Sequence, residues 1–198
     1  MIRNGKVFVN CVFRTDVEVR VHHGQVREVG CGLAKGLYEE EVDLAGDYLL
    51  PGFVDVHACV WGGCDETQQE DAVRTLSRAL FRQGVAAFRL CLAGMSPEDD
   101  SAAPEGVRRV MQRPEHRGAL VLGVHLGALD EDGAALTMPQ RLEKMVRHDG
   151  VAAAEAVLLC TAIPAESVGE SLAGRICAGA PAPLTRWSAD WRWKGILA

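Results

Sequence analysis

Two residues with metal-binding side chains follow an apolar run in the first third of the chain. Residues 52–56 predict a strand buried on both faces, and His57 and Cys59 come directly after it, two positions apart. Because alternate residues of a strand point to one face, both side chains would lie on the same face. Imidazole and thiolate can both bind a metal such as zinc, although a histidine at a strand end and a cysteine inside a strand are also ordinary structural residues.

Alternating strands and helices would position this strand end. The apolar periodicity predicts about four strand–helix units. The expected strands cover residues 52–56, 85–92, 119–126 and 154–162, and the expected helices cover residues 69–83, 96–111, 138–148 and 164–173. Strands that are apolar throughout and alternate with helices indicate a parallel sheet covered by helices.

The expected fold class is therefore α/β, as a doubly wound sheet or as a partial TIM-type (β/α) barrel with about half of the eight strands of a complete one. Strand-like patterns without helices precede it, over residues 6–29 and 41–50, and indicate a separate small β unit. We expect an N-terminal β segment over residues 1–50, a barrel-like part over residues 51–173 and a divergent tryptophan-rich tail over residues 174–198.

Composition narrows the classes of partner and compartment. The chain has 198 residues and a net charge of -6, with acidic and basic residues interspersed, so we expect neither nucleic acid nor a membrane as a partner. No apolar stretch has the length of a membrane span or of a signal peptide, which favours a cytoplasmic protein. The seven cysteines form no CxxC pair and are odd in number, which favours reduced thiols.

A series of short phrases connects the chain to a known family. The phrase DYLLPGFVDVH at residues 47–57 is followed by GGCD at 62–65, GVAAF at 84–88, SPE at 96–98 and VLGVHL at 121–126. In order and spacing these phrases resemble the amidohydrolase superfamily, and within it most closely the N-acetylglucosamine-6-phosphate deacetylases. The resemblance covers residues 5–165 and weakens after Gly127.

The resemblance implies a site and a reaction. It implies a divalent metal, zinc or iron, held at the mouth of the barrel by His57, Cys59 and His125, and a substrate contact at Asp65. The implied reaction removes the N-acetyl group of an amino-sugar phosphate. It also implies that the leading strands form a small β-sandwich with strands from the far C-terminus, and we expect no such partner strands in residues 174–198.

Several residues of the family pattern are missing. Gly127 and Ala128 stand where the family has a metal-binding glutamate, which Asp130, Glu131 or Asp132 could replace only in a remodelled loop. No histidine follows His148, and the family's later catalytic aspartate has no counterpart. The catalytic residues are therefore unknown, and we expect little turnover.

Two other hypotheses stay open beside a deacetylase. One is a truncated, non-catalytic remnant that survives as a binding or assembly module, and the other is a different amidohydrolase that acts on a cyclic amide. A half barrel would have unpaired strand edges, so we expect a homo-oligomer or an unstable monomer. The change of composition after Gly174 suggests a frameshifted end, or tryptophans that cover an open sheet edge.

Overall fold

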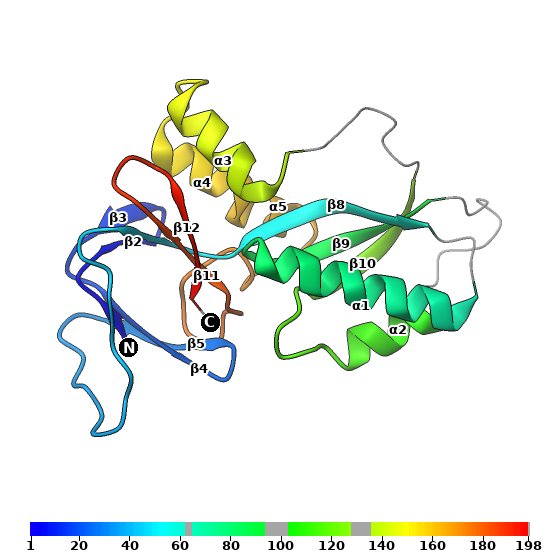
Figure 1. Ribbon diagram of the computed structural model, residues 1–198, viewed down its shortest axis with the longest axis horizontal. Helices are drawn as coiled ribbons and strands as arrows, with labels where there is room; N and C mark the ends of the chain where they lie inside the picture. The colour runs from blue at the N-terminus through cyan, green and yellow to red at the C-terminus, as the bar shows by residue number, and fades with distance from the viewer. Residues whose placement is uncertain (62–64, 94–102, 128–135, 198) are drawn as a thin grey trace.

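A three-stranded parallel sheet carries the segment that the motifs single out. The computed structural model describes residues 1–61, 65–93, 103–127 and 136–197 (Figure 1). The strands β8 (Phe53–Trp61), β9 (Val85–Ala93) and β10 (Leu120–Gly127) pair in the order β10-β9-β8. These three strands confirm three of the four that the apolar runs predict. Within the described residues the sheet does not close into a barrel.

Two helices cover one face of this sheet. Helix α1 (Glu66–Arg82) follows β8, and helix α2 (Glu105–Gln112) follows β9 and packs beside α1 (Figure 1). Their apolar stripes meet the strands in one core, in which Val73 of α1, Val107 of α2 and Phe88 of β9 are fully buried. The helix expected over residues 69–83 is thus confirmed, whereas the SPE helix start at 96–98 lies outside the described residues.

The expected fourth strand is wrong, because residues 154–162 lie in helices. Helix α3 (Met138–Arg147) follows β10, as expected, and is followed by α4 (Ala153–Cys160) and α5 (Ala162–Ser167). The sequence of α4, AAEAVLLC, is rich in good helix formers, and a short apolar run has no periodicity that separates a buried helix from a buried strand. The parallel sheet β10-β9-β8 therefore has no fourth strand within the described residues.

Helix α5 lies on the sheet face opposite α1 and α2. Its Ala165 packs with Val54 of β8, Ala87 of β9 and the nearby Ala173, while Val56, Leu120 and Leu122 border this small cluster. A closed barrel would bury this face with its own remaining strands. Here small side chains of a short helical segment cover part of it.

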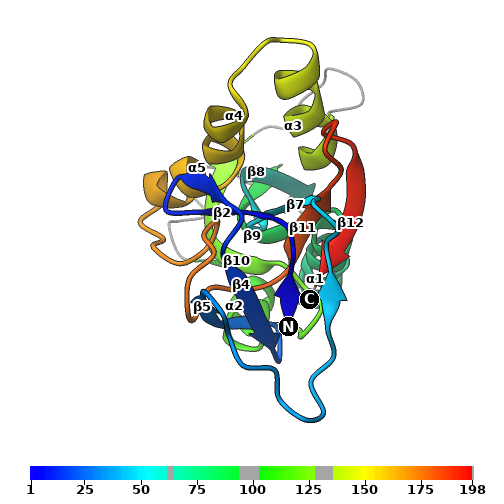
Figure 2. The ribbon, with the colours of Figure 1, turned by 90° about the vertical axis from the view of Figure 1, so that its left-hand side faces the viewer.

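Two further sheets enclose a second core at the other end of the molecule (Figure 2). One has the order β5-β4-β1-β6 and the other the order β12-β11-β7-β2-β3. Val19 of the first sheet and Val7, Leu49 and Leu184 of the second are fully buried between them. The strands are β1 (Ile2–Arg3), β2 (Lys6–Val9), β3 (Val12–Arg14), β4 (Glu18–His22), β5 (Gln25–Gly30), β6 (Val42–Asp43), β7 (Tyr48–Leu50), β11 (Leu184–Trp187) and β12 (Trp193–Leu197).

The expectation that the leading strands lack C-terminal partners is wrong. Strand β11 pairs antiparallel with β7, with Thr185 opposite Leu50, and β12 pairs with β11. The tryptophans are part of this packing, since Trp187 is fully buried and Trp191 stacks on Tyr48 with ring centroids 4.5 Å apart. Burial of large apolar side chains stabilises this arrangement, so the C-terminal hairpin is a structural part of the N-terminal sheet.

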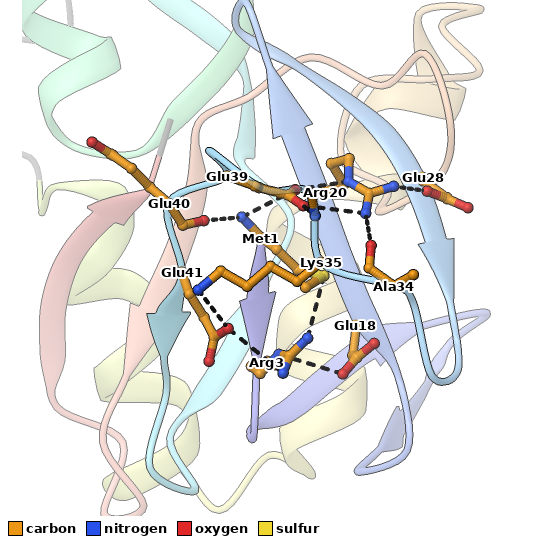
Figure 3. A network of polar contacts seen from close by, with 11 residues as sticks. Met1, Arg3, Glu18, Arg20, Glu28, Ala34, Lys35, Glu39, Glu40 and Glu41 are labelled. Carbon is orange, nitrogen blue, oxygen red and sulfur yellow. Dashed lines mark hydrogen bonds and ion pairs between the residues drawn. The ribbon is translucent and has the colours of Figure 1, made fainter.

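An ionic network connects the β5-β4-β1-β6 sheet to the loop before β6 (Figure 3). Arg20 of β4 binds Glu39 at 2.7 Å and the carbonyl of Ala34 at 2.7 Å, and it also pairs with Glu28. Hydrogen bonds from this guanidinium hold the pKa of Glu39 at about 2.

Among the described residues, no helix has the length and apolar character of a membrane-spanning segment.

Candidate metal centre

The candidate ligands lie on one face of a parallel sheet whose strand pairing is irregular. The pairing of β8 with β9 shifts between Phe53 and Val54 and again between Asp55 and Ala58, and that of β10 with β9 shifts between Val121 and Gly123. A bulge inserts one residue and re-aims the side chains that follow it. Beyond these shifts Cys59 and His125 both lie opposite Cys91, so one row of the sheet carries all three.

His57 completes the group. Its Nδ1 lies 3.1 Å from Nε2 of His125, and its Nε2 lies 3.5 Å from Sγ of Cys59. Donor atoms of His57, Cys91 and His125 all lie within 4.8 Å of one another. The structure therefore brings together the three residues that the sequence nominates, and it adds Cys91.

The distance between the His57 and His125 nitrogens fits the ligand shell of one small ion. Tetrahedral zinc with Zn–N bonds of about 2.0–2.1 Å separates two imidazole nitrogens by roughly 3.3 Å. The His57–His125 separation needs only a few tenths of an ångström of adjustment to reach that value. A thiolate and two imidazoles are also donors that select zinc and other borderline metals over magnesium or calcium.

The protonation of His125 favours ligation as well. Burial first, and then the neighbouring His57 and Arg89 side chains, lower the pKa of His125. Neutral imidazole is the form that binds a metal. The buried Nδ1 of His125 has no hydrogen-bond partner among the described residues, whereas the Nε2 of this ring faces His57.

The site is open on the side of His57. That side chain is exposed, while Cys91 is buried and His125 is partly buried. His57 and Asp55 line a cavity of about 800 Å³ that extends along β8 toward α3 and α4. Asp55 also fixes the local backbone, because its Oδ1 accepts a hydrogen bond from the His57 N–H at 3.0 Å. An ion held by three ligands here would keep one position accessible.

Asp65 has a structural role in the described part of the chain. Its side chain caps helix α1 by accepting a hydrogen bond from the Gln68 N–H at 2.9 Å. A contact between Asp65 and a substrate stays a prediction. The GGC part of the loop at 62–64 and the acidic residues Asp130, Glu131 and Asp132 lie outside the described residues.

Cys91 is the candidate ligand that the sequence analysis missed. It lies near the end of an apolar strand and looks like a small core residue. The available signal was its place in β9, which follows the strand of Cys59 and must pair with it if the sheet is parallel. Cys59 as a ligand stays a prediction.

Comparison with known proteins agrees with this fold. No protein-family model matches the chain, and no curated protein matches it in sequence. Among solved structures, the chain has the fold of the amidohydrolase superfamily. This similarity confirms the mixed α/β class and the amidohydrolase-like fold that the motifs predict.

The similar structures include several deacetylases. N-acetylglucosamine-6-phosphate deacetylase from Pasteurella multocida matches with a TM-score of 0.68 and 10% identity, over 100% of this chain and 97% of that chain. N-acetyl-D-glucosamine-6-phosphate deacetylase from Mycobacterium smegmatis matches with a TM-score of 0.62 and 13% identity, over 99% and 97%. β-Aspartyl dipeptidase from Fervidobacterium islandicum matches with a TM-score of 0.57 and 14% identity, over 100% and 94%.

Proposed function

We propose that this chain is a metal-dependent amidohydrolase in which His57, Cys91 and His125 hold one divalent ion, zinc by the chemistry of the donors. The observation that carries the proposal is the convergence of three donor atoms, one from each of three adjacent parallel strands, within 4.8 Å. Such convergence at the carboxyl ends of parallel strands is where active sites form in barrel enzymes.

The partial barrel belongs to the same proposal. Strands β8, β9 and β10 correspond to the first part of a TIM-type barrel, with α1 and α2 on the outside. Helix α5 lies on the face that would be the interior of the barrel. In this arrangement the ligand-bearing ends of the strands remain open, because Ala165 and Ala173 cover Val54 and Ala87, which precede the ligands along their strands.

The chemistry divides between the ion and the chain. A bound divalent ion supplies a Lewis acid for an amide carbonyl and lowers the pKa of water. The chain holds His57 in place through the Asp55 hydrogen bond, and it provides a cavity of about 800 Å³ beside the exposed imidazole. This volume lies in the usual range for a small-molecule site.

For the substrate we propose an N-acetylated, phosphorylated amino sugar. The support is similarity, since a variant of the Mycobacterium smegmatis deacetylase was crystallised with N-acetyl-D-glucosamine-6-phosphate, and it matches this chain with a TM-score of 0.60 and 13% identity. Acetate release from N-acetylglucosamine 6-phosphate tests the proposal. Release that requires added zinc and disappears in His57→Ala would support it, and zinc-loaded protein without acetate release would contradict deacetylation.

A second candidate is a metal-binding protein without hydrolytic activity. The donor cluster contains imidazoles and a thiolate and no carboxylate among the described residues, a composition that is common in structural zinc sites. In that function the ion would join β8, β9 and β10 in the absence of further barrel strands. Stoichiometric zinc, loss of folding on chelation and no hydrolysis would identify this candidate.

A further inference from the structure

The cavity beside His57 has walls of different chemistry. Its lining includes Asp55 and His57 from β8, and the charged side chains of Arg141, Lys144 and Asp149 on and after α3. Apolar side chains from β8, α3 and α4 also line it, among them Val54, Met138, Met145 and Leu159. A ligand of this cavity would need an apolar part and would meet charged groups at two places.

Arg141 is the positive group of the cavity that has no acidic partner among the described residues. Its Nε donates a hydrogen bond to the Leu136 carbonyl at 3.0 Å. The two terminal nitrogens of the guanidinium can therefore donate to a ligand. Lys144, on the same helix, binds Asp149 with Nζ–O distances of 2.7 and 2.8 Å. The Lys144 and Asp149 charges compensate each other, so Arg141 determines the charge of this part of the cavity.

Arg141 and Cys160 line the same cavity. Burial raises the pKa of the Cys160 thiol to about 12, while the positive charge of Arg141 opposes this shift. Helix α3 is fixed at its start, because Thr137 and Gln140 form a capping box one turn before Arg141. The Arg141 backbone N–H also bonds the Thr137 carbonyl at 2.9 Å.

We propose that the cavity binds a compound that carries an anionic group, a phosphate or a carboxylate, and that Arg141 binds this group while the rest of the compound extends toward His57. A guanidinium fork with two free nitrogens matches the paired oxygens of both anions. The inference deepens the proposed function and rests on it, since it assigns to Arg141 the selection of charged amides.

Isothermal titration calorimetry with inorganic phosphate tests directly whether Arg141 binds the anion. We expect Arg141→Gln to raise the Kd for phosphate at least tenfold and Arg141→Lys to raise it less. The matched control is Arg147→Gln on the same helix, where the guanidinium pairs with Glu143 and does not line the cavity, and which should change the Kd less than twofold. A parallel titration with acetate shows whether a carboxylate binds through the same residue.

His57→Ala separates this inference from the metal site. Phosphate binding that survives in His57→Ala and is lost in Arg141→Gln supports an anion site on α3, whether or not zinc is found in the protein. Phosphate binding that survives in Arg141→Gln and is lost in His57→Ala places the anion on the metal and overturns the role of Arg141. Equal binding by all variants, or none by the wild type, also overturns it.

Discussion

Asp47 and Arg186 form an ion pair across 139 positions of the chain, with Nε of Arg186 2.6 Å from Oδ2 of Asp47. Lys194 binds the same carboxylate at 2.9 and 3.0 Å. Asp47 is nearly buried and precedes β7, whereas its two partners belong to the C-terminal hairpin. The pair therefore fastens residues 184–197 to the N-terminal sheet.

Removing this carboxylate should destabilise the protein. Burial raises the pKa of Asp47, but the hydrogen bonds from Lys194 and Arg186 outweigh it and leave the pKa below its usual value. Charged hydrogen bonds are worth about 1.5–3 kcal/mol, so we expect Asp47→Asn to lower the free energy of unfolding by about 2 kcal/mol at pH 7 in urea. The matched control is Asp190→Asn, which breaks an exposed pair with Arg192 and should cost under about 0.5 kcal/mol.

The same pair predicts a dependence of stability on pH. Because the folded-state pKa of Asp47 is depressed, its contribution is present above the unfolded pKa of about 3.9 and is lost as the pH falls through the folded value. Wild-type protein should therefore lose more stability between pH 5 and about pH 2.5 than Asp47→Asn does. Parallel pH profiles of the two proteins in urea would contradict a charged Asp47 in the folded state.

The backbone at Gly52, just before β8, is packed too closely for a side chain. A Cβ at this position would lie 2.5 Å from the Pro183 carbonyl oxygen and 2.6 Å from the Ala86 Cβ. The former atom belongs to the C-terminal segment, so the motif is packed against the hairpin as well as against β9. We expect Gly52→Ala to lower the free energy of unfolding by about 1–3 kcal/mol, measured by denaturant titration.

Gly36→Ala is the control for this substitution. A Cβ at Gly36 meets only the Glu39 side chain at 3.5 Å, an ordinary contact, in an exposed loop. We expect a change within about 0.5 kcal/mol. If Gly52→Ala were as stable as Gly36→Ala, the close approach of residue 183 to the start of β8 would be wrong.

The capping box of α3 should contribute to the position of Arg141. Thr137→Ala removes a side chain whose Oγ1 accepts from the Gln140 N–H at 3.4 Å, and such caps are worth about 1 kcal/mol. We expect a loss of this size in thermal unfolding and a weaker affinity for phosphate, since the first turn of α3 would fray. Unchanged phosphate affinity in a destabilised Thr137→Ala protein would separate the cap from the anion site.

The sequence predicts the parallel strands well because their residues are apolar on both faces. Phe88, Leu90 and Leu92 belong to the core that contains residues of α1 and α2, while Ala87 belongs to the cluster with Ala165 of α5, so the run is apolar on both faces and indicates a fully buried element. The same property misled the prediction at residues 154–162. Ala156 and Val157 are buried in a helix, and burial alone does not distinguish the two structures.

The pairing of the C-terminal hairpin and the place of Cys91 in the site depend on long-range strand pairing, which no local sequence pattern contains. The change of composition after Gly174 made the tail look divergent, although its Trp187 is fully buried. Cys91 becomes a candidate ligand only through its register with Cys59 and His125. The pairing includes three register shifts, and a bulge has no reliable sequence signal.

Elemental analysis of the untagged protein tests the central claim most directly. We expect about one zinc per chain in the wild type and in Cys177→Ala, whose thiol lies outside the cluster, and a loss of at least tenfold in metal affinity in His57→Ala, Cys91→Ala and His125→Ala. Cys59→Ala shows whether the neighbouring thiol is a fourth ligand. Absence of zinc and iron from the wild type, or zinc retained in all three ligand variants, would contradict a metal centre at the ends of β8, β9 and β10.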